Sequence, residues 1–150
     1  MCPDELLTRG MFPHYADASA LREMNGVTMA FIGDAVYELL VRDYVLSAAN
    51  GRAELLHRQT VAFSNAAFQS AAAKALLSLL TEEEQAVFRR GRNAHTGHTP
   101  KNKTRAEYHL ATALEAVFGW LYLTGQMQRL KALFGAVVNL KEESDHADEQ

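Results

Sequence analysis

Residues 27–48 are VTMAFIGDAVYELLVRDYVLSA, and this stretch decides the fold class. Its apolar residues recur three and four positions apart, which is the spacing of an α-helix that buries one face. Asn50 and Gly51 follow closely, and both residue types tolerate the left-handed backbone that ends a helix. We therefore predict one long helix from about Val27 to Ala48.

The remainder of the chain keeps this helical spacing, and no run of β-branched residues bounded by turn residues indicates a strand. The predicted fold class is therefore all-α. Two capping boxes, each a threonine followed three residues later by a glutamate, mark helix starts at Thr81 and Thr104. The predicted elements are a helix over 53–80 that can bend near Ser64 and Asn65, a short helix from Thr81 to Gly91, a loop over 91–103, a helix from Thr104 to about Leu123 that Gly125 stops, and a final helix over 126–140. The core contacts expected within 53–80 are Leu56, Val61, Phe63, Phe68, Leu76 and Leu79.

The composition is that of one globular domain, because 150 residues with 48% hydrophobic and 22% charged side chains suffice to bury a sizeable core. We expect an N-terminal extension over 1–22, the domain over 23–140, and a disordered tail over 141–150, where five acids face one base. The apolar stretches are shorter than the roughly 20 residues that span a bilayer, and the N-terminus lacks the apolar segment of a secretory signal. With Cys2 as the single cysteine, the cytoplasm is the expected compartment.

The distribution of charge is more informative than its sum. The net charge of −3 would by itself argue against a nucleic-acid partner. Residues 89–105, however, contain six lysines and arginines and no acid. Such a segment, lying between two helix ends and containing Gly and Asn, is expected to contact phosphate groups. The alternative is that the segment is only solvated surface.

Two carboxylates, Asp34 and Glu115, lie in apolar helical runs where a charge is costly. A buried carboxylate needs a cation, a hydrogen-bond donor or a solvent channel. If the two helices pack side by side, both carboxylates can bind one Mg²⁺, which prefers oxygen ligands and retains several waters. Gly33 costs a helix interior about 1 kcal/mol relative to alanine, so a close approach by another backbone or a ligand is expected there.

A different interpretation of these acids is that they face solvent or pair with basic residues, as acids on helices usually do. Glu38 lies four residues after Asp34 and falls on roughly the same face. It also lies four residues before Arg42, and we expect an ion pair between Glu38 and Arg42 rather than a metal contact.

Three segments together resemble one family. FIGDAVYE over 31–38 resembles the signature helix of ribonuclease III catalytic domains, and ALEAVFGWLYL over 113–123 resembles their second catalytic helix. Between them, RGRNA over 90–94 and TPKN over 99–102 are similar to the loop of the short bacterial branch, Mini-ribonuclease III. The resemblance covers roughly residues 25–133.

This resemblance implies an all-helical homodimer with a catalytic valley across the dimer interface, and no separate double-stranded-RNA-binding domain. It implies Mg²⁺-dependent hydrolysis of double-stranded RNA to 5′-phosphate and 3′-hydroxyl ends, with precursor 23S ribosomal RNA as the substrate. Asp34 and Glu115 are then the catalytic and metal-binding residues, and Phe31 belongs to core or dimer packing. The residues expected to hold the duplex are Arg90, Arg92, Asn93, Lys101, Asn102 and Lys103. Ribosomal proteins are possible accessory partners.

Two positions depart from the wider family. Other ribonuclease III enzymes carry a glutamate four residues before the aspartate and an aspartate three before the final glutamate, where this chain has Ala30 and Thr112. Fewer acids should weaken metal affinity or leave more water around the ion. The competing hypotheses are therefore a module that binds structured RNA without cutting it, and a helical scaffold that has no RNA function.

Overall fold

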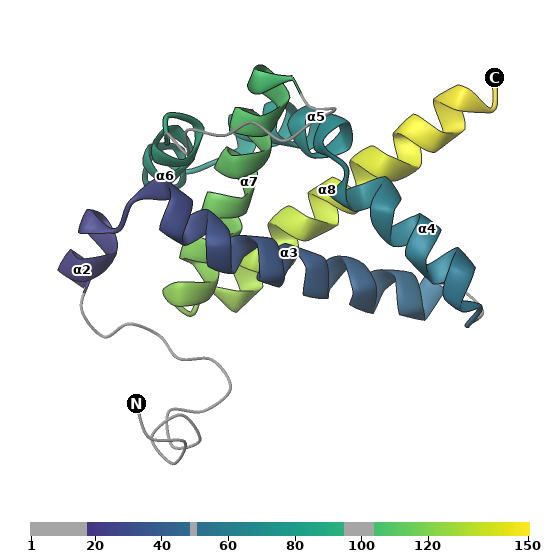
Figure 1. Ribbon diagram of the computed structural model, residues 1–150, viewed down its shortest axis with the longest axis horizontal. Helices are drawn as coiled ribbons and strands as arrows, with labels where there is room; N and C mark the ends of the chain where they lie inside the picture. The colour runs from purple at the N-terminus through teal and green to yellow at the C-terminus, as the bar shows by residue number, and fades with distance from the viewer. Residues whose placement is uncertain (1–17, 49–50, 95–103) are drawn as a thin grey trace, which may run out of the picture.

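The computed structural model describes residues 18–48, 51–94 and 104–150. Within these ranges every regular element is helical and there is no strand, which confirms the predicted all-α class. The elements are α2 (Ala18–Glu23), α3 (Gly26–Ala48), α4 (Ala53–Ser64), α5 (Ala66–Leu76), the 3₁₀ turn η1 (Leu77–Leu79), α6 (Glu82–Arg92), α7 (Arg105–Leu123) and α8 (Met127–Asp148) (Figure 1). No helix in the described ranges has the length and apolar character needed to cross a bilayer.

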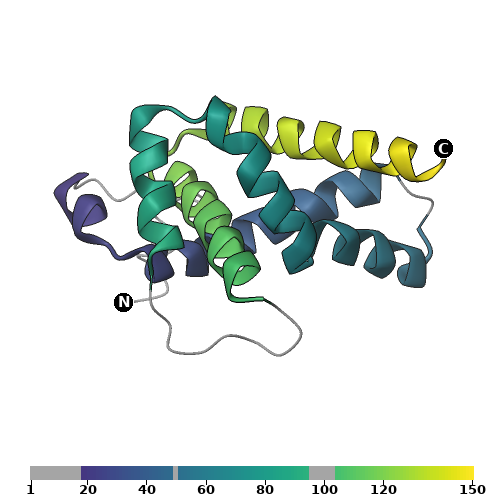
Figure 2. The same ribbon diagram turned by 90° about the horizontal axis from the view of Figure 1, so that it is seen from above.

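Helix α7 is the centre of the fold. It packs against α3, α5, α6 and α8, and its contact with α3 is the most extensive between any two described elements (Figure 2). Residues on all sides of α7 are buried accordingly, as expected for a helix that is apolar all round. The buried Tyr37 ring of α3 packs edge-on against Phe118 of α7 and Phe134 of α8, so one aromatic cluster joins three helices.

The helix ends follow the predicted cap residues. Asn65 separates α4 from α5, and its side chain accepts a hydrogen bond from the backbone N–H of Phe68, so the predicted bend is a break between two helices. The Thr81 capping box is complete, with Glu84 bonded back to the Thr81 backbone. Gly51 and Gly125 adopt left-handed backbone, with φ of 61° and 71°.

The prediction of a disordered tail over 141–150 was wrong, because α8 continues to Asp148. Lys141 pairs with Asp145 one turn later at 2.8 Å and lies over the ring of Phe68, and the Tyr44 hydroxyl donates to Glu142 at 3.4 Å. These contacts with α3 and α5 hold the first turn of the predicted tail against the domain, and the charged residues continue the helix from there.

Two further expectations need correction. The predicted boundary at residue 22 cuts through α2, whose Leu21 is buried in the domain, while residues 1–17 lie outside the described residues. Of the expected core residues in 53–80, Phe63 and Leu76 are buried and Leu56 and Phe68 are partly buried, but Val61 and Leu79 are exposed. Helical spacing alone could not distinguish the buried residues from the exposed ones, because neighbouring elements decide which part of an apolar helix face is covered.

Candidate active site

The crossing of α3 and α7 is set by two glycines. A Cβ atom added to Gly33 would overlap the carbonyl oxygen of Glu115, and one added to Gly119 would overlap the carbonyl oxygen of Met29. The two backbones are therefore in direct contact at this point. This confirms the close backbone approach that Gly33 predicts.

The same crossing brings together the backbone segments that carry the two predicted catalytic carboxylates. Asp34 directly follows Gly33 on α3, and Gly33 packs on the backbone of Glu115 itself. Asp34 is exposed and Glu115 is half-buried. The expectation that both acids are embedded among apolar side chains is therefore wrong for Asp34. Its neighbours Gly33 and Val36 face the core while Asp34 faces solvent.

Glu115 has a buried amide beside it. The Gln69 side chain, on α5, is 4% exposed and donates from Nε2 to Glu115 Oε1 at 3.5 Å. Burial, followed by the negative charges of Glu115 and Glu38, raises the pKa of Tyr37 far above its ordinary value. The Tyr37 phenol therefore stays protonated and donates to the carbonyl of Phe63 at 2.7 Å. Sequence reasoning missed Gln69, for which the only signal was a glutamine within an alanine-rich helix.

Glu38 lies on roughly the same face of α3 as Asp34, and two neighbouring side chains bind its carboxylate. Arg42 Nε donates to one carboxylate oxygen at 2.9 Å and the Ser64 hydroxyl donates to the other at 2.9 Å. The predicted pairing of Glu38 with Arg42 is confirmed. Its carboxylate thus fixes the start of the α4–α5 break against α3.

The donor set for a metal ion consists of few groups. Among the described residues, no cluster of three or more acidic, histidine or cysteine side chains could hold an ion. Ala30 and Thr112 are buried, and the Thr112 hydroxyl is bonded to the carbonyl of Tyr108 at 2.8 Å, so neither position supplies a ligand. Mg²⁺ nevertheless binds through one or two carboxylates, with waters and substrate phosphates completing its shell. Asp34 and Glu115 are compatible with this arrangement.

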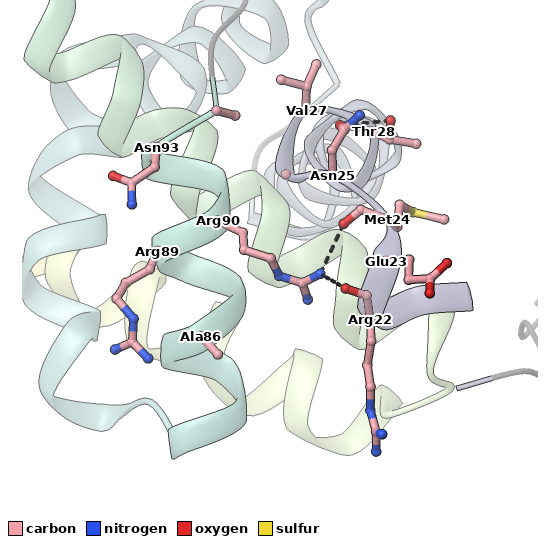
Figure 3. Close-up of a pocket in the computed structure, with 12 residues that line it drawn as sticks. Arg22, Glu23, Met24, Asn25, Val27, Thr28, Ala86, Arg89, Arg90 and Asn93 are labelled. Carbon is pink, nitrogen blue, oxygen red and sulfur yellow. Dashed lines mark hydrogen bonds between the residues drawn. The ribbon is translucent and has the colours of Figure 1, made fainter. Parts of the chain in front are cut away.

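The basic segment begins at the end of α6. Arg92 and Asn93 are exposed there, whereas Arg90 is half-buried. Arg90 Nη1 donates to the carbonyls of Arg22 at 2.6 Å and Met24 at 3.0 Å (Figure 3). The structure therefore gives Arg90, which we expected to contact RNA, the task of holding the end of α2. Lys101, Asn102 and Lys103 lie outside the described residues.

Comparisons with known proteins show which family the chain belongs to. The model of the ribonuclease III domain family matches residues 27–126. The chain is 40% identical to Mini-ribonuclease 3 of Clostridium tetani over 83% of each chain, and 41% identical to Mini-ribonuclease 3 of Symbiobacterium thermophilum over 77% of this chain and 89% of that one. A crystal structure of a Fusobacterium nucleatum protein has a TM-score of 0.72 and 34% identity, and the match covers 79% of this chain and 95% of that one. The chain therefore belongs to the ribonuclease III family of endoribonucleases.

Proposed function

We propose that this protein cleaves double-stranded RNA in a Mg²⁺-dependent reaction, with Asp34 and Glu115 as its catalytic and metal-binding residues. The observation that carries this proposal is the contact of Gly33 with the Glu115 backbone, which brings both carboxylate-bearing segments together at the crossing of α3 and α7. The family supports the duplex substrate.

The two carboxylates have different surroundings and hence different tasks. When bound, Mg²⁺ would supply a Lewis acid for the scissile phosphate and an activated water for its attack, leaving 5′-phosphate and 3′-hydroxyl ends. Asp34, exposed on α3, would meet the ion on the side from which RNA arrives. Glu115, half-buried beside Gln69, would bind from the protein side with its carboxylate orientation held by the amide.

The finer substrate is proposed from the resemblance to the short bacterial branch. We assign the protein to the maturation of precursor 23S ribosomal RNA in the cytoplasm, with ribosomal proteins as accessory partners. Arg92 and Asn93 would contact duplex phosphates at the end of α6, together with Lys101, Asn102 and Lys103.

The active form is proposed to be a homodimer. Phe31 is 81% exposed, Leu39 is 67% exposed and Leu46 is 64% exposed, and all three lie on α3. At 100° per residue these three apolar side chains fall within a sector of roughly 80° beside the sector that carries Asp34, and the exposed Arg42 lies between them. An apolar stripe of this kind on a surface helix is typical of a protein interface, and the predicted core position of Phe31 is excluded by its exposure.

Cleavage of a long RNA duplex in Mg²⁺, with EDTA as a control, tests the proposal. We expect fragments with 5′-phosphate ends from the wild type, and none from Asp34→Asn or with EDTA. Asp43→Asn is the matched control, because Asp43 is also an exposed aspartate of α3 but lies more than two turns beyond Asp34. It should cleave like the wild type. Mg²⁺ binding measured by calorimetry without RNA should weaken in Asp34→Asn and not in Asp43→Asn.

A second candidate function is favoured by Ala30 and Thr112, which leave two positions of the site without acids. In that case the protein would bind duplex or precursor ribosomal RNA without cutting it. Wild-type protein that binds both RNAs and leaves both intact in Mg²⁺ would establish this alternative. Cleavage that persists in folded Asp34→Asn would instead move the reaction to other residues.

A further inference from the structure

A cavity of about 830 Å³ lies where α2, the start of α3 and the end of α6 meet. Arg22, Arg89 and Arg90 line it, and Glu23 is the only acid among the described residues that do so. Thr28 and Asn93 add polar groups at its edges (Figure 3). The cavity therefore gathers positive charge in a chain whose net charge is −3.

Arg90 shapes this cavity, but its guanidinium is already bonded to backbone carbonyls. Its Nη1 donates to the carbonyl of Arg22, and Leu21 is buried beneath, so α2 is fixed against α6. This contact places Arg22 across the cavity from Arg89, and Figure 3 shows both side chains extending in the same direction on either side of Arg90. Gathering three cations is unfavourable unless an anion compensates them.

Arg22 and Arg89 retain their hydrogen-bonding capacity. Within the described part of the chain, neither guanidinium takes part in an ion pair or a side-chain hydrogen bond, and both residues are exposed. A guanidinium presents paired N–H donors that match the oxygens of a phosphate group. Two such groups on opposite walls are suited to a phosphodiester backbone that passes between them.

The position of the cavity connects it to the candidate active site. Val27 lines the cavity and lies seven residues before Asp34 on α3, so the two occupy nearly the same helix face. Their separation along the helix axis is about 10 Å. Among the described residues, no aromatic side chain lines the cavity, so these residues offer a nucleotide base no stacking partner. These features favour the backbone of an RNA duplex over a free nucleotide.

We propose that this cavity binds the phosphodiester backbone of duplex RNA through Arg22 and Arg89, beyond the site of cleavage. The inference rests on the proposed function and extends phosphate binding from Arg89, the first residue of the predicted basic segment, to Arg22 on α2, which the sequence did not indicate. Arg90 is its positioning residue.

The test compares Arg22→Gln/Arg89→Gln with Arg52→Gln/Arg58→Gln, which removes two exposed arginines at the opposite end of α3. Duplex RNA binding is measured in EDTA, where no cleavage occurs, at several salt concentrations. Each lost phosphate contact lowers the salt slope by about 0.9, so the Arg22/Arg89 variant should lose about 1.8. Between about 50 and 200 mM salt, wild-type affinity should then fall about tenfold more than that of the variant. The control pair should keep the wild-type slope.

Three results would overturn the inference. The first is an unchanged salt slope in the Arg22/Arg89 variant, and the second is an equal loss in the control pair, which would indicate only a general charge effect. The third is a variant that no longer binds inorganic phosphate, which the wild type binds, but still binds duplex RNA as the wild type does. The cavity would then be a small-anion site. Sedimentation of both variants excludes an altered oligomeric state as the cause of a lost slope. Wild-type cleavage in Mg²⁺ is measured separately, so failure of the proposed function is distinguished from failure of this cavity.

Discussion

At the scale of single residues, Gly33 and Gly135 are helical glycines with different packing around them. Both lie inside α-helices, where glycine costs about 1 kcal/mol relative to alanine. An added Cβ at Gly33 would overlap the backbone of Glu115, whereas one at Gly135 would meet no atom of the described residues within 4 Å. The cost at Gly33 is therefore offset by the contact of α3 with α7, and the cost at Gly135 is not offset by any packing.

Gly33→Ala should destabilise the protein by about 3 kcal/mol or more, because two backbones must separate to admit the methyl group. The molecules that remain folded should also lose RNA cleavage activity, since the separation of the two helices moves Asp34 away from Glu115. Gly135→Ala, the matched control, should raise the free energy of unfolding by about 0.5–1 kcal/mol and leave cleavage unchanged. Urea unfolding followed by circular dichroism measures both effects. A Gly33→Ala protein as stable and active as the wild type would show that the two helices do not need this contact.

At the scale of elements, local chemistry predicted most helix boundaries and tertiary contacts decided the rest. Asn65 and the Thr81 capping box satisfy backbone groups of their own helices, so their effect is visible in a few neighbouring residues. The continuation of α8 depends on Lys141 meeting Phe68 of α5, and the end of α2 depends on Arg90 of α6. Neither pairing can be predicted from residues so far apart in the sequence.

In the candidate site, too, some features could be predicted from the sequence and others depend on tertiary packing. The apolar runs and the resemblance identified Asp34 and Glu115, and Gly33 indicated the close backbone approach. The exposure of Asp34 and the contact of Gln69 with Glu115 depend on how α3, α5 and α7 are packed. For that reason the sequence could predict the two candidate acids but not how far each of them is exposed.

Helix α6 is joined to α8 by a charge pair that should make stability depend on pH. Glu84 is 1% exposed, and Arg129 donates to it from Nε and Nη2 at 2.9 and 2.8 Å. Burial opposes ionisation of Glu84, but the hydrogen bonds and charge of Arg129, with hydrogen bonds from Thr81, hold its pKa below the ordinary value. Because the folded-state pKa is lowered, the stabilisation is present above the unfolded-state pKa and is lost as the pH falls through the folded-state value.

Glu84→Gln should therefore lower the free energy of unfolding by roughly 2–4 kcal/mol at neutral pH, because Arg129 loses its anionic partner. The difference from the wild type should shrink below about pH 4, as the wild-type carboxyl itself becomes protonated. Glu83→Gln, an exposed neighbour on the same helix, should change stability by less than about 0.5 kcal/mol. Denaturant unfolding across this pH range provides the measurement, and a Glu84→Gln deficit that stays constant down to acid pH would contradict the ion pair as its cause.

At the scale of the whole molecule, one group of arginines and one group of acids lie far apart along the longest axis. The cavity arginines Arg22 and Arg89 lie at the α2 end, while the acidic last turns of α8 lie at the opposite end (Figure 1). RNA would be attracted to the first end and repelled from the second, so the long-range field would orient the duplex before contact.

The apolar stripe on α3 makes the oligomeric state the decisive property of the complete protein. Leu39→Arg places a charge within the stripe, where a partner would have to bury it, so the variant should sediment as a monomer while the wild type sediments as a dimer. Leu79→Arg is the control, because Leu79 is also an exposed leucine at 53% but lies on η1, away from α3. It should remain a dimer. Since the stripe adjoins the sector with Asp34, loss of the dimer should also abolish cleavage by Leu39→Arg while Mg²⁺ binding persists. A wild-type protein that is monomeric at cleaving concentrations, or a Leu39→Arg monomer with full activity, would show that each chain carries a complete site and that the stripe serves another contact.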